Sequence, residues 1–155
     1  MEISYCPSLD DSFPCGLWPP NLRWLEIGGL KKDISEPASL VTLILNGRNS
    51  DRVVSFGAEA EDISSFLLPS SLTRLHLLFF TVSEGLQHLT SLQHLGIWLC
   101  PKLRDLPETQ LPSLLSLAVI ECSPELRKKC SPGRRKGKYW SIISQIPRLT
   151  VRKTV

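Results

Sequence analysis

The 155-residue sequence predicts an α/β fold in which short parallel strands recur along the chain, joined by irregular or short-helical return segments. Three observations predict this class. A leucine spacing recurs five times, and the centre of each copy alternates apolar and polar residues, as a half-buried strand does. Prolines fall between the copies, where they discourage long helices. With 42% hydrophobic and 21% charged residues, the chain has the composition of one globular domain with a buried core.

The recurring spacing is Leu-x-x-Leu-x-Leu, with Ile or Val also allowed at the last position. The five copies are Leu22/Leu25/Ile27, Leu40/Leu43/Leu45, Leu72/Leu75/Leu77, Leu92/Leu95/Ile97 and Leu114/Leu117/Val119, and a partial copy ends at Ile3. Their last positions are separated by 24, 18, 32, 20 and 22 residues. These intervals centre on the roughly 20 to 29 residues of leucine-rich repeats. We therefore predict a leucine-rich-repeat solenoid, a horseshoe with a curved parallel β-sheet and one short strand per repeat.

We expect the solenoid to occupy residues 1–126 in five to six coils, and a basic loop and capping segment to occupy 127–155. The 18-residue interval predicts a short, extended return leg, and the 32-residue interval predicts an enlarged coil with a loop or short helix near 57–66. The apolar residues of "YWSIISQIPRLTV" are expected to cover the open end of the core. Amphipathic helices are the alternative, since leucines at i and i+3 also fit a helical period, but five recurrences favour strands.

Three cysteines share the ninth position of a repeat, counting its first leucine as one: Cys6, Cys100 and Cys122. We interpret them as fillers of a tight, buried turn after the strand. The competing hypothesis is a hydrolase with a Cys nucleophile and a His base, but the motif contains no paired histidine. The five cysteines include no C-x-x-C pair, and His76, His88 and His94 lack metal-site spacing, so we expect reduced thiols, no metal and no cofactor.

Three segments carry a family resemblance: "LPSSLTRLHL" (68–77), "GLQHLTSLQHLGIWLCPKLRDLPETQLPSLLSLAVIECSPEL" (85–126) and "GKYWSIISQIPRLTV" (137–151). They resemble the last repeats and carboxyl terminus of plant nucleotide-binding leucine-rich-repeat disease-resistance proteins. The resemblance implies a non-enzymatic protein-interaction module of the defence response, in the cytoplasm or alternatively the nucleus. Its implied partners are a pathogen effector, a monitored host protein (guardee) or other domains of the parent receptor, with no small-molecule substrate.

The sequence departs from that family because it contains no signalling or nucleotide-binding domain before its first repeat. We expect a truncated gene product or a fragment of a longer protein. The string "GRRKGKY" (133–139) has three residues between its glycines, where a phosphate-binding loop needs four, and Tyr139 replaces the hydroxyl that binds magnesium. ATP or ADP binding is therefore not expected. A substrate adaptor of an F-box ubiquitin ligase is the alternative within the same fold, although no F-box-like helical segment is present.

Partners of a solenoid usually dock on its concave face, which the outward residues of each strand form. Aromatic and Arg side chains dominate binding hot spots, and exposed aromatics are costly without a partner. The candidate residues are Trp24, Glu26, Arg74, His76, Phe79, His94, Trp98 and Glu121. As an alternative, Leu78, Phe79 and Phe80 are buried under the neighbouring irregular coil.

Charge is distributed unevenly along the chain. Residues 1–126 contain 8 Lys and Arg against 15 Asp and Glu, whereas residues 127–155 contain 10 basic residues and no acidic one. The candidate basic patch consists of Arg127, Lys128, Lys129, Arg134, Arg135, Lys136 and Lys138. Such a patch can attract nucleic acid, anionic lipid or a nuclear import receptor, but a solvated loop is the favoured interpretation. No apolar run approaches the roughly 18 residues of a membrane span, and the first residues do not resemble a secretion signal.

Overall fold

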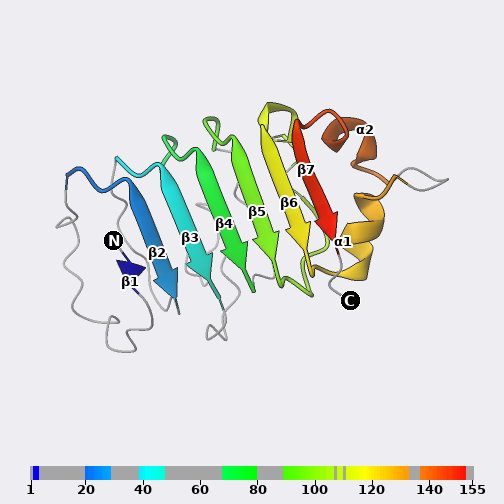
Figure 1. The fold of residues 1–155 in the computed structure, drawn as a ribbon, viewed down its shortest axis with the longest axis horizontal. Helices are drawn as coiled ribbons and strands as arrows, with labels where there is room; N and C mark the ends of the chain where they lie inside the picture. The colour runs from blue at the N-terminus through cyan, green and yellow to red at the C-terminus, as the bar shows by residue number, and fades with distance from the viewer. Residues whose placement is uncertain are drawn as a thin grey trace, which may run out of the picture.

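The computed structural model describes residues 2–3, 20–28, 39–47, 68–79, 89–106, 108–109, 111–132 and 137–152. Within them the chain forms one open, all-parallel sheet whose strand order follows the chain from β1 to β7 (Figure 1). The strands are β1 (Glu2–Ile3), β2 (Trp24–Gly28), β3 (Thr42–Asn46), β4 (Arg74–Leu78), β5 (His94–Trp98), β6 (Ser116–Ile120) and β7 (Arg148–Arg152). The predicted α/β class with parallel strands is confirmed.

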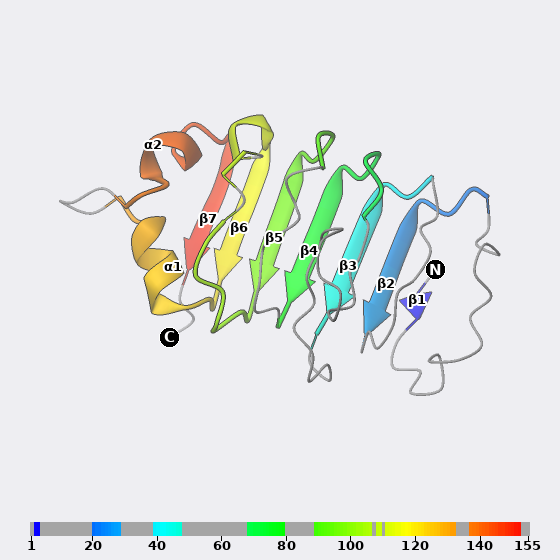
Figure 2. The same cartoon turned by 180° about the vertical axis from the view of Figure 1, so that it is seen from behind.

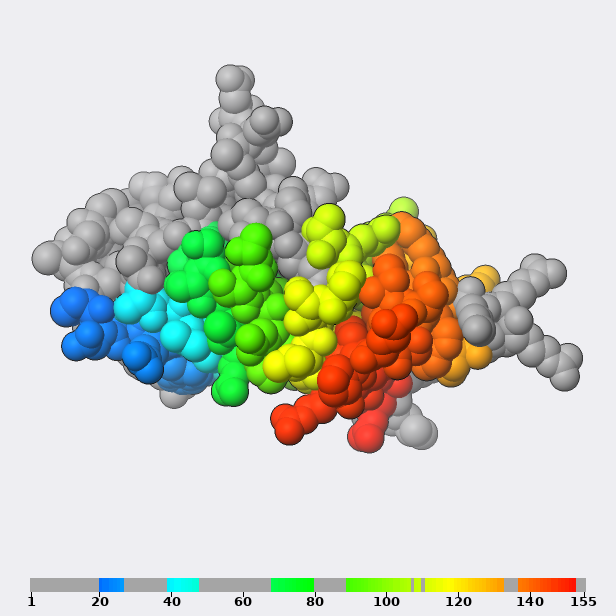
Figure 3. Space-filling model, turned by 90° about the horizontal axis from the view of Figure 1, so that it is seen from above, coloured from blue at the N-terminus to red at the C-terminus, as the bar shows by residue number. Residues whose placement is uncertain are grey.

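The strands pair in a constant register, so that equivalent positions of successive leucine motifs lie side by side. Leu75 of β4 is opposite Leu95 of β5, which in turn is opposite Leu117 of β6. The last motif positions, such as Leu77 and Ile97, pair in the same way. The alternative in which these leucines lie on amphipathic helices is therefore wrong. Figure 3 shows the same order, with the colours passing from blue to red across the molecule.

The core lies against one face of the sheet. The inward residues of β3 and β4, such as Leu43 and Leu75, are at most 1% exposed, and the first leucine of each motif is buried beside them. Full burial of one leucine contributes roughly 1.5 to 3 kcal/mol. A single strand cannot bury its own leucines, and so the core exists only because consecutive strands stack. The described part of the return leg between β5 and β6 crosses behind the strands (Figure 2) and adds Leu103, Leu106 and Leu111 to this core.

A left-handed residue follows three of the strands. Phe79, Leu99 and Glu121, each at position eight of its motif, have φ angles of 62°, 54° and 55°. This conformation costs a residue with a Cβ roughly 1 to 2 kcal/mol, so the packing that follows must offset the strain. The turn directs position nine into the core, where Cys100 and Cys122 are 0% and 5% exposed. Their prediction as buried turn residues is confirmed.

Short helical segments lie after the last two repeats. They are the 3-10 helix η2 (Leu111–Ser113), α1 (Pro124–Lys129) and α2 (Trp140–Ile143). Ser123 caps α1: its hydroxyl accepts a bond from the Leu126 amide at 3.1 Å and donates to the carbonyl of Leu103. Arg127, Lys128 and Lys129 occupy the last turn of α1, where cations stabilise the helix dipole. The first basic residues of the tail are thus helical, whereas we expected a loop.

The carboxyl-terminal segment contributes both core residues and a strand. Tyr139, Ile143 and Ile146 are buried in the same core as the repeats. Arg148–Arg152, expected only as part of the capping segment, pairs with β6 as the seventh strand. The sequence contains the pattern of this strand, because Ile146, Leu149 and Val151 repeat the motif spacing with isoleucine in the first position. The spacing that predicts the other strands has leucine in the first position and therefore does not include this copy.

The enlarged coil near 57–66, the extended return leg before β3 and Cys6 lie outside the described residues. None of the helices in the described ranges has the length and apolar content needed to cross a membrane.

Candidate protein-binding face

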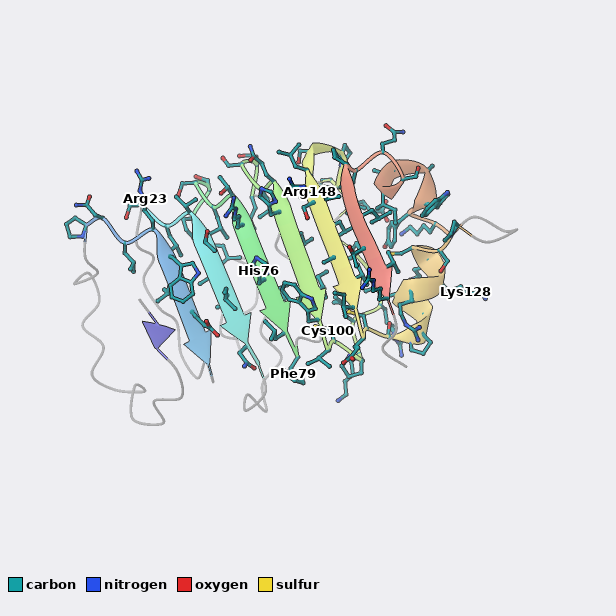
Figure 4. The ribbon with its side chains drawn as sticks, viewed as in Figure 1. Arg23, His76, Phe79, Cys100, Lys128 and Arg148 are labelled. Carbon is teal, nitrogen blue, oxygen red and sulfur yellow. The ribbon has the colours of Figure 1, made fainter. Side chains whose placement is uncertain are left out.

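The side chains of β2 to β7 that alternate with the core leucines form the second face of the sheet, which we call the open face. Its residues with described side chains are Trp24, Glu26, Thr42, Ile44, Asn46, Arg74, His76, Leu78, His94, Gly96, Trp98, Ser116, Ala118, Ile120, Arg148, Thr150 and Arg152. The first residues of the strands, among them Arg74, His94 and Arg148, form one row across the sheet. Figure 4 shows His76 in the middle of this face and Arg148 near the amino-terminal ends of the strands.

An aromatic stack occupies the centre of the open face. The rings of His76 on β4 and Trp98 on β5 are parallel within 7°, with centroids 4.7 Å apart. His76 is opposite Gly96 in the register, whereas Trp98 is opposite Leu78, so the stack is a diagonal contact between strands. Gly96 makes it possible: a Cβ at this position would lie 2.9 Å from Nδ1 of His76 and closer still to the indole of Trp98. The missing side chain allows the indole to lie back across its own strand.

Both histidines of this face favour the neutral form. Burial and then the Arg74 and His94 charges lower the pKa of His76 below its usual value of 6.5. Burial and then Arg74 and Arg148 lower the pKa of His94 in the same direction. The row therefore carries its permanent charge on arginines, and the influence of Arg148 on His94 shows that the residues of the row act on one another across β6.

The structure brings six of the eight predicted contact residues onto the open face. These are Trp24, Glu26, Arg74, His76, His94 and Trp98. Phe79 and Glu121 instead lie in the left-handed turns at the carboxyl-terminal ends of β4 and β6, where both are half-buried. Arg148, Thr150 and Arg152 extend the face by one strand and were missed with β7. The contribution of Gly96 had no signal in the sequence, because it depends on which residue is diagonal to it across the sheet.

Three of the four described residues of the basic patch, Arg127, Lys129 and Lys138, form contacts within the carboxyl-terminal part of the chain. Nζ of Lys129 lies 2.8 Å from the carboxylate of Asp105, and Lys138 forms an ion pair with Glu108. These carboxylates raise the pKa of both lysines. Nε of Arg127 donates to the carbonyl of Cys122 at 3.2 Å.

The buried Tyr139 also links the tail to the preceding coil. The hydroxyl of Tyr139 donates to Asp105 at 2.7 Å and accepts from the amide of Leu106 at 3.2 Å. Burial and the bond to Asp105 raise the pKa of Tyr139. Lys128 is exposed, and Arg134, Arg135 and Lys136 lie outside the described residues. Lys129 and Lys138 thus attach the tail to the preceding coil through ion pairs.

The position-nine cysteines repeat one hydrogen-bond pattern. Sγ of Cys100 lies 3.9 Å from the carbonyl of Leu77 and 3.1 Å from that of Trp98, and Sγ of Cys122 lies 3.4 Å from the carbonyls of both Ile97 and Ile120. Each thiol therefore bridges its own strand and the one before it.

The chemistry of the thiols follows from burial and from their neighbours. A hydrogen bond from Cys100 lowers the pKa of Cys122 to about 7 against the opposing effect of burial, and burial raises the pKa of Cys130 to about 12. A nucleophilic thiol also needs a base and access for substrate. Cys122 is only 5% exposed, and its polar contacts within the described structure are backbone carbonyls and Cys100.

A hollow of about 250 Å³ lies between η2 and α2. It is lined by Leu111, Pro112, Leu114, Ile142, Gln145 and Ile146, none of which titrates. Across the described ranges, no three His, Cys, Asp or Glu side chains gather closely enough to hold a metal ion.

These features define the chain as an α/β protein with an open parallel sheet, one face of which carries an aromatic stack and exposed arginines. No protein-family model, curated protein or solved structure matches the chain.

Proposed function

We propose that the chain is a leucine-rich-repeat solenoid that binds another protein through its open face and performs no chemistry. The single observation that carries the proposal is the His76–Trp98 stack, held by Gly96 on a sheet face opposite the core. Tryptophan and arginine are the residues that most often dominate protein interfaces, and a rigid sheet presents them with little entropic cost on binding.

The resemblance to plant disease-resistance proteins supports a narrower proposal. The chain is the repeat region of an immune receptor of the cytoplasm, with the nucleus as the alternative compartment. Its partner is then a pathogen effector, a monitored host protein or another domain of the parent receptor. The left-handed turns after β4, β5 and β6 support the solenoid, because the same strained backbone recurs at the same motif position.

An affinity capture from infected leaf extract tests the proposal. The immobilised chain is compared with Trp98→Ala, which removes the stack, and with Leu115→Ala as the matched control. Leu115 is 47% exposed and lies outside the open face, so its truncation removes a comparable exposed apolar group. We expect a partner retained by the wild type and by Leu115→Ala and lost with Trp98→Ala.

A partner retained equally by all three proteins would show that the open face is not the binding site. The far-ultraviolet circular dichroism of each variant serves as the folding control, because Trp98 is only half-buried and its truncation leaves the core intact.

A further inference from the structure

The charges of the open face are unbalanced. Its described residues on β3 to β7 include Arg74, Arg148 and Arg152 and no carboxylate. All three arginines are exposed, and within the described ranges none has a carboxylate at ion-pair distance. The only described acidic side chain of the face is Glu26, on β2.

Outside the open face, several described basic side chains are paired with carboxylates. Arg104, Lys129 and Lys138 are matched by carboxylates: Arg104 by Glu125 at 3.7 Å, Lys129 by Asp105 at 2.8 Å, and Lys138 by Glu108. Within the described ranges, the charges of the coil and the tail thus neutralise one another, whereas the arginines of the open face have no counter-charge there. Aligned cations without counter-charges repel one another, and an acidic partner would relieve that repulsion.

The register sets the spacing of these charges. Arg74 and Arg148 begin β4 and β7, three strand intervals apart, which corresponds to about 14 Å at a strand spacing of about 4.8 Å. His94 and Ser116 lie between them in the same row. An extended peptide advances about 3.3 Å per residue, so side chains four residues apart on one of its faces are about 13 Å apart. Two carboxylates at that separation would reach both arginines.

We propose that the open face takes an extended acidic segment of its protein partner, with Asp or Glu carboxylates on Arg74 and Arg148 and an apolar group against the Trp98–His76 stack. This inference rests on the protein-binding function proposed above and names the chemistry of the partner. Guanidinium groups bind carboxylates through two parallel hydrogen bonds, which gives direction as well as affinity. Ser116, between the two arginines, adds a hydroxyl donor to the same row.

The charge density favours a protein segment over nucleic acid. Nucleic-acid affinity comes largely from Lys and Arg that neutralise phosphates, about 6 to 10 of them in a site with strong salt dependence. The open face offers three permanent cations, and its two histidines have lowered pKa values and are neutral near pH 7. A few carboxylates match this face, whereas a phosphate backbone would leave most of its charges without partners.

Fluorescence anisotropy with three labelled probes tests the inference: deca-glutamate, deca-glutamine and an oligothymidine of the same length. The full chain is compared with Arg74→Gln/Arg148→Gln and with Lys102→Gln/Lys128→Gln. The second pair is the matched control, because it removes two positive charges from exposed positions outside the open face, and within the described ranges neither lysine has a carboxylate at ion-pair distance; Figure 4 shows Lys128 beyond β7. We expect deca-glutamate to bind the wild type more tightly than either other probe.

Arg74→Gln/Arg148→Gln should bind deca-glutamate about tenfold more weakly than the wild type. This is the loss expected when two exposed ion pairs, each near the upper end of the free energies that such pairs contribute, are removed. The control pair should change the affinity less than about twofold. Arg148→Lys should retain part of the affinity lost with Arg148→Gln, because it keeps the charge without the guanidinium.

Four results would overturn the inference. They are no binding of deca-glutamate, equal losses of affinity in the two double variants, tighter binding of oligothymidine than of deca-glutamate, or a loss of deca-glutamate affinity on replacing Arg134, Arg135 and Lys136 with Gln but not in Arg74→Gln/Arg148→Gln. None of them affects the capture experiment with Trp98→Ala, so failure of the acidic partner and failure of protein binding are distinguishable.

Discussion

Replacing Gly96 with alanine is the sharpest test of the open face. The added Cβ would be 2.9 Å from Nδ1 of His76 and would overlap the outer ring of Trp98, so at least one ring of the stack must move. The backbone of β5 and the core leucines behind it are unaffected, because the new methyl group lies on the opposite face. Gly96→Ala therefore perturbs the stack with the smallest change the chain allows.

The magnitude follows from two opposing effects. Alanine is favoured over glycine within a strand by roughly 0.5 to 1 kcal/mol, because glycine loses more conformational freedom on folding. The stack is worth about 0.5 to 1.5 kcal/mol, and a displaced side chain costs a further 0.5 to 1.5 kcal/mol or so. We expect a net destabilisation of about 1 kcal/mol. In a Trp98→Ala background the two closest contacts are removed, and the His76 ring, no longer held in the stack, can turn away from the new methyl group. The same substitution should then stabilise by about 0.5 kcal/mol.

Urea unfolding, followed by circular dichroism, of the wild type, Gly96→Ala, Trp98→Ala and the double variant measures both changes in the free energy of unfolding. The coupling energy between positions 96 and 98 should be about 1.5 kcal/mol, and the near-ultraviolet signal of Trp98 should weaken in Gly96→Ala. Equal effects of the substitution in both backgrounds would refute the reasoning, because they would mean that the indole does not lie over Gly96.

Three further predictions concern the core, the tail and pH. Leu75→Ala should lower the free energy of unfolding by about 3 to 4 kcal/mol because the side chain is 0% exposed, whereas Leu115→Ala should change it by less than about 0.5 kcal/mol; similar urea midpoints would contradict the assigned core. Tyr139→Phe should cost about 1 to 3 kcal/mol, since the buried amide of Leu106 loses its acceptor, and an unchanged thermal midpoint would show that this contact is unimportant. The pKa values of His76 and His94 are lowered in the folded state, so below about pH 6.5 the unfolded chain binds more protons than the folded chain. The stability that these histidines contribute should therefore be complete above that pH and be lost as the pH falls through their folded-state pKa values. A urea midpoint that depends equally on pH in His76→Gln/His94→Gln would assign the effect to other groups.

Much of the fold could be predicted because the leucine spacing is a local signal that recurs. Alternation within "LHL" or "LGI" assigns one face of a strand to the core, and repetition at intervals near 20 residues makes the strands parallel. The same reasoning identified six residues of the open face, since the positions between buried leucines must point away from them. β7 carries this signal as well, in Ile146, Leu149 and Val151, and the spacing with isoleucine in the first position predicts it.

The sequence by itself therefore determined which residues form strands and which side of each strand is buried, because these properties depend on neighbours two or three positions away. Only the tertiary structure decided that Trp98 stacks diagonally on His76, that Phe79 and Glu121 leave the face through left-handed turns, and that Lys129 and Lys138 are neutralised by Asp105 and Glu108. These contacts join residues some 20 to 30 positions apart, or depend on the turn after a strand. They are set by the register between strands and by the path of the return legs, which no short window of the sequence contains.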